Sequence, residues 1–198
     1  MRPALYGAAG LAAAGVAAVA HPLWQGLDDG WHMFVTGPRE GLQWGLAMVL
    51  DFIGGPKGLI VTLAVVLLLV VLKRWRSALF FFTGGLAAAI VAQLFKHAVD
   101  RPRPGDALVV VDHGSFPSGH VVTAAATIVL LGVIIPAAWR QAWLGFGVVY
   151  VVLVIWSRTY VYAHWLSDAI AGALIGAGVA LLWWALFQRL LRKENHVH

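Results

Sequence analysis

The 198-residue sequence contains no cysteine and few charged side chains. Without cysteine there is no disulfide framework, no thiol nucleophile and no thiolate metal site. Charged residues make up only 12% of the chain, whereas hydrophobic residues make up 61%. A typical soluble domain has roughly 25% charged residues, and so few charges could not cover this much apolar surface in water. The composition excludes a disordered chain, a fibrous chain and an ordinary cytosolic enzyme, and it indicates an integral membrane protein.

Long uncharged segments divide the chain into six expected membrane spans. A helix of about 20 residues crosses the hydrocarbon core of a bilayer, and six such helices would use nearly all of the apolar residues. The segments are Pro3–Leu27, Gly58–Leu72 (extended outward past Lys57), Ser77–Phe95, His113–Trp139, Gln141–Ser157 and Ala169–Gln188. The sequence thus predicts an all-α, polytopic membrane protein with six transmembrane helices, and residues 1–198 form one domain.

The stretch His21–Pro56 differs from these segments, because it holds four carboxylates and repeated Gly and Pro. We expect a loop there, with an interfacial helix over its half-apolar piece, Leu42–Ile53. The first segment also resembles a signal peptide, since Arg2 precedes an Ala-rich run that ends in Ala18-Val19-Ala20. That run is long enough to span a membrane, so we expect the helix to be retained.

Basic residues predict the orientation of the spans, because cytoplasmic segments carry an excess of Lys and Arg. With a cytoplasmic N-terminus, eight of the 14 basic residues fall inside and six outside, and four of those six belong to the clusters described below. Eight of the nine carboxylates also fall outside, all except Glu194. We therefore expect both termini in the cytoplasm, and we attribute the net charge of +5 to orientation and not to nucleic-acid binding.

Polar side chains gather at the ends of the predicted spans. The third span ends in Lys96–Pro104, the fourth begins with Phe116–His120, and Trp156–Asp168 joins the last two. The predicted topology places these three clusters on the outer side of the membrane, where they can converge on a single site. An unpaired cation at the membrane boundary is costly, so cations gathered there indicate a function.

The residue types in these clusters suit phosphate chemistry. Lys96, Arg103 and Arg158 supply fixed positive charge, and the planar fork of Arg matches phosphate oxygens. Ser118 is a good helix cap, and Gly119 lets free backbone N–H groups approach an anion.

Two histidines and a carboxylate complete the set. His164 and Asp168 are four residues apart, so on the first turn of a helix they would share a face. A carboxylate bonded to one imidazole nitrogen fixes the tautomer and leaves the other nitrogen free to react. Together with His120, the pair predicts a site that transfers a phosphoryl group.

Each feature alone has a simpler interpretation. A boundary Lys or Arg usually snorkels or binds a lipid headgroup, and a Ser-Gly pair is commonly only a helix cap. A His–x3–Asp pair can also be a structural hydrogen bond or two metal ligands. We assign the other polar residues of the region to loop solvation or headgroup contact: Arg101, His97, Asp100, Asp106, Asp112 and His113. The combination of all three clusters is what favours catalysis.

In order and spacing, the clusters resemble the three-part signature of the type 2 phosphatidic acid phosphatase family of membrane lipid phosphatases. Its parts fall within residues 96–104, 117–120 and 157–168, as Lys96-x6-Arg103-Pro104, Pro117-Ser118-Gly119-His120 and Ser157-Arg158-x5-His164-x3-Asp168. The resemblance implies that His164 is a nucleophile oriented by Asp168, and that His120 protonates the leaving group. It also implies no metal and no cofactor. The phosphoryl oxygens would be held by Lys96, Arg103, Arg158, Ser118 and the N–H of Gly119.

The position of the site predicts the substrate class. A phosphate pocket at the outer interface suits a lipid whose headgroup reaches water while its tail stays in the bilayer. The resemblance implies a bacterial plasma-membrane enzyme for undecaprenyl diphosphate, which we favour, or for phosphatidylglycerophosphate or phosphatidic acid. Three alternatives remain open: a phosphotransferase with the same site, a phospholipid transporter without catalysis, and a structural protein whose boundary charges bind anionic lipid. The sequence leaves the oligomeric state open.

Overall fold

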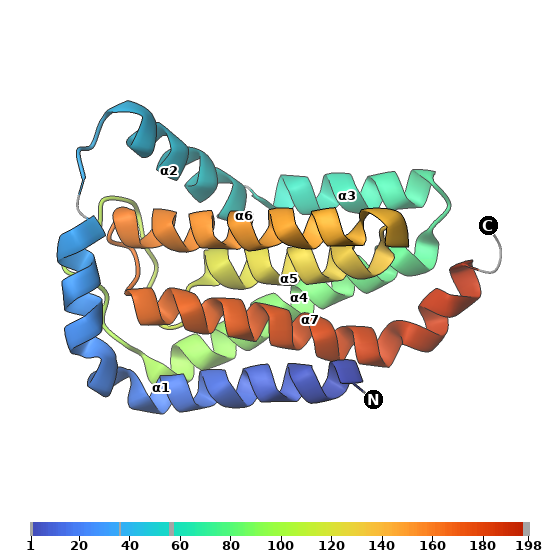
Figure 1. Cartoon of the computed structure of the whole chain (residues 1–198), viewed down its shortest axis with the longest axis horizontal. Helices are drawn as coiled ribbons and strands as arrows, with labels where there is room; N and C mark the ends of the chain where they lie inside the picture. The colour runs from blue at the N-terminus through green and yellow to red at the C-terminus, as the bar shows by residue number, and fades with distance from the viewer. Residues whose placement is uncertain (1, 36, 56–57, 196–198) are drawn as a thin grey trace.

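The computed structural model describes residues 2–35, 37–55 and 58–195, and these ranges are all-α. Helices are expected in a bilayer because a helix satisfies its own backbone hydrogen bonds. Most of the helices run side by side along the longest axis of the molecule (Figure 1). The helices of the described residues are α1 (Arg2–Val35), α2 (Gly41–Gly54), α3 (Leu59–Val71), α4 (Trp75–Val99), α5 (Gly119–Ile134), α6 (Arg140–Tyr160) and α7 (Leu166–Asn195).

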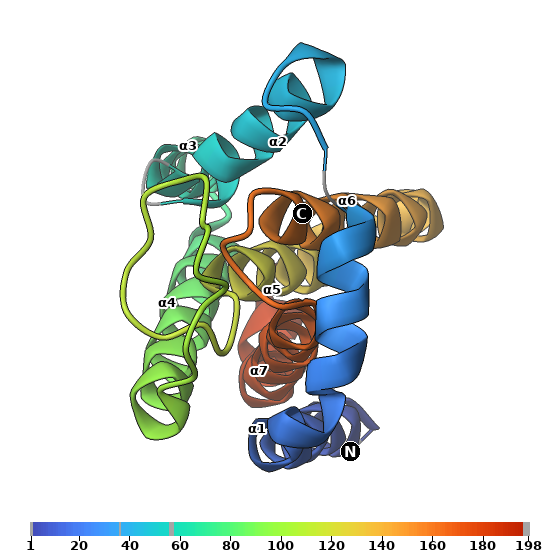
Figure 2. The same cartoon turned by 90° about the vertical axis from the view of Figure 1, so that its left-hand side faces the viewer.

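Helix α1 is longer than the sequence predicts. The loop expected from His21 onward is wrong in its first part, because the helix continues to Val35. Figures 1 and 2 show that α1 first follows the bundle and then turns to cross one end of it. Pro22 lies inside α1 and removes a backbone donor, which bends a helix. The carboxylate of Asp28 does not force this part of the chain into water, because it is buried with hydrogen-bonding partners.

Helix α2 confirms the helix predicted over Leu42–Ile53, since it runs from Gly41 to Gly54. It is inclined to the rest of the bundle and lies near the end that α1 crosses (Figure 1). It packs against α6 and α5. This placement brings a segment expected to be peripheral close to the predicted site.

All six predicted spans contain a helix, but not all of these helices are long. By length and composition, the described residues hold four candidate spans, in α1, α4, α6 and α7, and a fifth if α2 and α3 form one bent span. Helix α5 has 16 residues, which corresponds to about 24 Å against a hydrocarbon core of about 30 Å. It is shorter than predicted because Pro117 and Pro136 lie just outside its two ends. The expected extension of the second span past Lys57 lies outside the described residues.

Helix α5 lies among α4, α6 and α7 and forms the centre of the bundle. Its buried side chains pack with Phe80 of α4 and Ile175 of α7 in the main apolar cluster. Gly172 lets α7 approach the start of α5 closely, because a Cβ atom there would lie 2.8 Å from the backbone oxygen of Ser118. This packing holds together the two helix ends that carry predicted site residues.

Candidate active site

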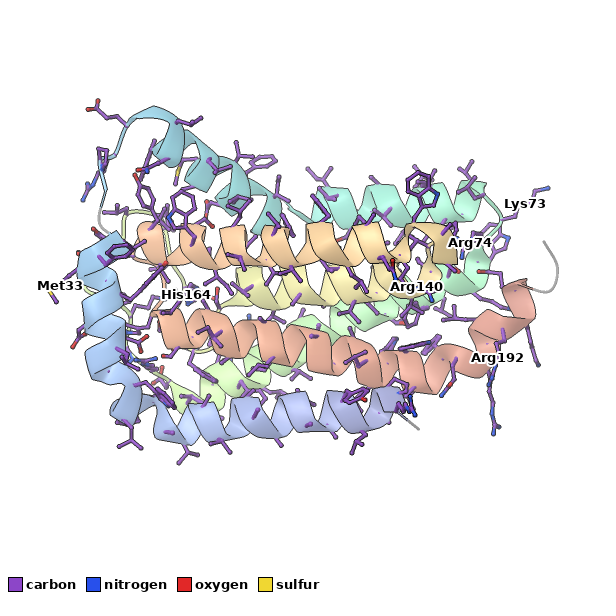
Figure 3. The ribbon with its side chains drawn as sticks, in the orientation of Figure 1. Met33, Lys73, Arg74, Arg140, His164 and Arg192 are labelled. Atoms are coloured by element: carbon purple, nitrogen blue, oxygen red, sulfur yellow. The ribbon has the colours of Figure 1, made fainter. Side chains whose placement is uncertain are left out.

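The three polar clusters meet at one end of the bundle. Figure 2 looks onto this end and shows the α4–α5 and α6–α7 loops near one another, and Figure 3 places His164 there. A cavity of about 540 Å³ opens between them. Six of the eight predicted site residues line this cavity: Lys96, Arg103, Gly119, His120, Arg158 and His164. The remaining two, Ser118 and Asp168, are fully buried beside it and do not line it.

His164 is held with one ring nitrogen protonated and bonded, and with the other facing the cavity beside Arg103. Its Nδ1 lies 2.7 Å from the carbonyl oxygen of Ser115, which can only accept, so Nδ1 carries the proton. Its Nε2 lies 3.2 Å from Nη1 of Arg103 inside the cavity. Burial, together with the positive charges of Arg103, Arg158 and Lys96, lowers the pKa of His164 well below its ordinary value of 6.5. The imidazole is therefore neutral at pH 7, with a lone pair on Nε2.

Asp168 reaches His164 through Ser115 and not directly. Its carboxylate accepts hydrogen bonds from Oγ of Ser115 at 2.5 Å and from the backbone N–H of Trp165 at 3.2 Å. The direct carboxylate–imidazole bond was expected because the two residues were placed on one helical turn. Helix α7 begins only at Leu166, so His164 precedes it and the shared-face argument does not apply. Asp168 fixes Ser115, whose carbonyl in turn fixes the ring.

Arg101 belongs to the buried structure behind the site, and its assignment to loop solvation is wrong. Only 2% of its surface is exposed. Its guanidinium donates to Asp168 at 2.6 Å and to Asp28 of α1 at 2.8 Å. It also donates to Ser167 and Gln25, each at 2.8 Å. The sequence shows Arg101-Pro102 directly before Arg103-Pro104, but nothing in it links Arg101 to Asp28. Only the path of α1 across the end of the bundle brings Asp28 to this guanidinium (Figure 2).

Asp112 is exposed in its loop, as expected, and it also pairs with two of the predicted phosphate-binding cations, which the sequence did not indicate. Its carboxylate lies 3.4 Å from Nζ of Lys96 and forms an ion pair with Nη2 of Arg103. Lys96 also donates to the carbonyl oxygen of Gly114 at 2.9 Å. The remaining four residues of that set are exposed as well: His97, Asp100, Asp106 and His113.

Asp51 of α2 is a site residue that the sequence did not indicate. Its carboxylate pairs with Nη1 of Arg158 and lies 3.4 Å from Nε2 of His120. Gly54 on the same helix packs against the His120 ring, since a Cβ atom there would lie 2.7 Å from Cδ2 of that ring. Helix α2 therefore covers one side of the cavity. A phosphate must therefore compete with the carboxylates of Asp51 and Asp112 for the cations of the cavity.

The donors around the cavity suit an anion better than a metal ion. Lys96, Arg103 and Arg158 face it with three positive charges, against the two carboxylates of Asp51 and Asp112. Across the described residues, no three His, Asp or Glu side chains gather in a way that could hold a metal ion. Nε of Arg158 is buried without a hydrogen-bonding partner in the same residues, and a buried unpaired donor is costly. A phosphoryl group would supply the missing negative charge.

Comparison with known proteins agrees with this arrangement. The sequence-family model of the PAP2 superfamily matches residues 58–192 of this chain. A lipid A 1-phosphatase from Rhizobium johnstonii is 31% identical over 132 residues, which cover 58% of this chain and 49% of that protein. An undecaprenyl-diphosphatase from Sulfolobus acidocaldarius is 38% identical over 68 residues, which cover 34% of this chain and 31% of that protein. The chain therefore matches less than half the length of these two relatives.

The fold has a counterpart among solved structures. The crystal structure of a transmembrane PAP2-type phosphatidylglycerolphosphate phosphatase from Bacillus subtilis superposes with a TM-score of 0.82. The superposition covers 93% of this chain and 96% of that one, at 20% sequence identity. At that identity the likeness concerns the fold, while the family model spans more than half of the chain and includes all three motifs. The chain belongs to the PAP2 superfamily.

Proposed function

We propose that the protein is a membrane lipid phosphatase that works through a phosphohistidine intermediate, without a metal. The observation that carries this proposal is the orientation of the His164 ring, whose Nδ1 faces the carbonyl oxygen of Ser115 while Nε2 lies in a cavity among three cations. A transporter would need the cations but neither histidine. A structural protein would need neither the cavity nor the orientation of the ring.

The proposed reaction has two steps. Nε2 of His164 attacks phosphorus, so that a P–N bond forms while the bond to the leaving oxygen breaks. His120 donates a proton to that oxygen, and Lys96, Arg103 and Arg158 stabilise the charge on the phosphoryl oxygens. In the second step His120 takes a proton from water, which attacks phosphorus and releases His164 and inorganic phosphate. Asp168 and Ser115 keep the ring oriented throughout.

We further propose that six helices span the membrane, namely α1 and α3 to α7, with both termini in the cytoplasm of a bacterial cell. Lys73, Arg74, Arg140 and Arg192 lie at the end opposite His164 (Figure 3). The start of α1 and the end of α7 also lie towards that basic end (Figure 1). Because basic residues favour the cytoplasmic side, this arrangement supports an active site at the outer face of the plasma membrane.

The favoured substrate is undecaprenyl diphosphate, followed by phosphatidylglycerophosphate and phosphatidic acid. The two curated relatives are named for an undecaprenyl and a lipid A phosphate, and the solved structure for a phosphatidylglycerol phosphate. All three names describe a phosphate on a lipid. A phosphotransferase would use the same residues and differ only in the acceptor that reaches the phosphohistidine.

The test is phosphate release by the purified protein in detergent, measured in parallel on these three lipids and on lipid A. We expect release from at least one lipid, with undecaprenyl diphosphate turned over fastest. A different ranking would change the proposed substrate but not the reaction. Binding of every lipid without release would contradict a phosphatase, and an added alcohol acceptor would then distinguish a phosphotransferase from a transporter.

Replacement of His120 by alanine tests the second histidine. We expect kcat on the lipid substrate to fall by about 10² to 10⁴-fold, the usual contribution of a general acid. An aryl phosphate with an acidic leaving group needs no proton in the first step, so the burst of aryl alcohol that precedes hydrolysis of the phosphohistidine should fall much less. The matched control is His97→Ala, which removes an exposed histidine outside the cavity and should change neither rate. Equal losses on both substrates in this first step, measured before the phosphohistidine is hydrolysed, would rule out the general-acid role.

A further inference from the structure

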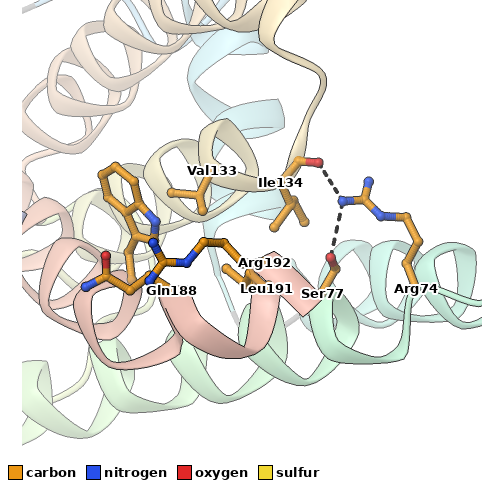
Figure 4. Close-up of a pocket in the computed structure, with 8 residues that line it drawn as sticks. Arg74, Ser77, Val133, Ile134, Gln188, Leu191 and Arg192 are labelled. Atoms are coloured by element: carbon orange, nitrogen blue, oxygen red, sulfur yellow. Dashed lines mark hydrogen bonds between the residues drawn. The ribbon is translucent and has the colours of Figure 1, made fainter. Parts of the chain in front are cut away.

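A second pocket lies at the end of the bundle opposite the active site. It has a volume of about 230 Å³ and is formed where the start of α4 meets the ends of α5 and α7 (Figure 4). Its lining combines two guanidinium groups, two neutral polar side chains, an indole and three aliphatic side chains. These are Arg74, Arg192, Ser77, Gln188, Trp184, Val133, Ile134 and Leu191.

Arg74 is fixed at one side of this pocket. Its Nη2 donates to the carbonyl oxygen of Ile134 at 2.8 Å and to Oγ of Ser77 at 3.2 Å, as the dashed lines in Figure 4 show. Its Nε lies 3.7 Å from the carboxylate of Glu194. That carboxylate is buried and also accepts from the backbone N–H of Arg76 at 2.8 Å. The guanidinium is therefore already ordered, so a ligand would not have to immobilise it.

Arg192 brings a second guanidinium to the pocket from α7, beside Gln188 (Figure 4). Its side chain makes no ion pair within the described part of the chain. The basic residues of this end of the bundle greatly outnumber its carboxylates, of which the described residues contribute only Glu194. These basic residues are Lys73, Arg74, Arg76, Arg140, Arg189, Arg192 and Lys193. The pocket thus has surplus positive charge, which favours an anion.

The walls of the pocket favour an anion that carries an apolar part. Val133, Ile134 and Leu191 form an aliphatic surface between the two guanidinium groups. Trp184 adds an indole, a side chain typical of the membrane interface. The same helices expose large apolar side chains further along the bundle, such as Leu79 on α4 and Leu186 on α7. A soluble phosphate would use the cations but leave these apolar surfaces without a partner.

From these observations we propose that this pocket binds the phosphodiester headgroup of an anionic phospholipid of the inner leaflet. Basic pockets between transmembrane helices on the cytoplasmic side are suited to such headgroups. The phosphate would lie between Arg74 and Arg192, with the glycerol and the first methylenes against the aliphatic wall. The three helices that form the pocket carry Lys96, His120 and Asp168 at their other ends. A lipid bound here would hold together the helices that position the catalytic groups.

The test is lipid retention by the intact protein, measured by native mass spectrometry as a function of lipid concentration. Phosphatidylglycerol is compared with phosphatidylcholine of the same acyl chains, and Arg192→Gln with Arg189→Gln. Arg189 carries the same charge on the same helix but does not line the pocket, so Arg189→Gln is the matched control. We expect wild type to retain phosphatidylglycerol about tenfold better than phosphatidylcholine, Arg192→Gln to lose most of this preference, and Arg189→Gln to keep it.

Equal losses in the two variants would overturn the proposal in favour of a diffuse basic surface, and so would equal retention of the two lipids by wild type. A third arm adds inorganic phosphate. If millimolar phosphate displaces the lipid from wild type, the site takes a soluble anion and the lipid assignment is overturned; continued retention supports it. The experiment needs no turnover, so failure of the proposed phosphatase activity would not affect its outcome.

Discussion

Replacement of His164 by alanine is expected to lower phosphate release by about 10³-fold or more, the scale seen when a catalytic nucleophile is removed. Nε2 of this ring is the atom that forms the bond to phosphorus in the proposed mechanism. The side chains of Lys96, Arg103 and Arg158 would still bind the phosphoryl group in the variant. The loss should therefore fall on kcat, with substrate binding largely retained.

The decisive readout for His164 is the covalent intermediate. Phosphohistidine survives alkali, so an alkaline quench after mixing with substrate labelled in its phosphoryl group should leave label on the wild-type protein. The His164→Ala variant should carry none, whereas the control His113→Ala, which removes an exposed histidine, should be labelled like wild type. Label on the alanine variant, or activity close to wild type, would mean that water or another side chain attacks phosphorus.

The convergence of the three motifs could be predicted from the sequence because each motif is a local pattern. His120 follows the N-cap of α5, Lys96 lies in the last turn of α4, and His164 lies in the loop just before α7. The alternation of the spans then puts all three at one end of the bundle. The structure brings them to one cavity, as expected. The membrane-spanning character was predictable for a similar reason, since it depends on composition over long windows and not on particular contacts.

Asp28 and Asp51 could not be predicted as partners of the buried arginines, because these contacts depend on how α1 crosses the end of the bundle and how α2 packs against α6. Asp28 and Asp51 lie in the stretch that the charge pattern indicated as a loop with an interfacial helix. A carboxylate in such a stretch is usually solvated, and nothing in the local sequence shows that a buried Arg lies opposite it. The tertiary contact of Asp28 with Arg101 overrides the local pattern. It also attaches the part of α1 beyond Pro22 to the end of the bundle.

The contact of Asp168 with Ser115 shows a second limit, which concerns helix boundaries. The sequence argument places His164 on the first turn of the last helix, whereas α7 begins two residues later, at Leu166. With this later start, Asp168 bonds to Ser115, and the carbonyl of Ser115 contacts the His164 ring. Boundaries are uncertain by about this amount in any sequence-based assignment. The sequence therefore predicts that His164 and Asp168 lie near one another, as they do, but not that Ser115 connects them.

Arg101→Ala is expected to have the largest effect on stability. The change leaves the carboxylates of Asp28 and Asp168 buried without their shared counter-charge. Removal of one partner from a buried ion pair costs about 3–5 kcal/mol of unfolding free energy. Arg101→Lys should recover only part of this, because a single ammonium group does not reproduce a planar fork that bridges two carboxylates. Denaturant-induced unfolding in detergent measures both variants.

Two comparisons separate this role of Arg101 from a general loss of charge. Arg39→Ala removes an exposed arginine at the same end of the molecule and should unfold like wild type. Asp28→Asn combined with Arg101→Met removes one carboxylate along with the cation. It should therefore be more stable than Arg101→Ala, since fewer buried charges are left unpaired. If Arg101→Ala unfolds like wild type, the two carboxylates do not depend on this guanidinium. In that case other contacts must hold α1 across this end of the bundle. The hydrogen bonds that Ser167 donates to Asp28 are the contacts closest to Arg101.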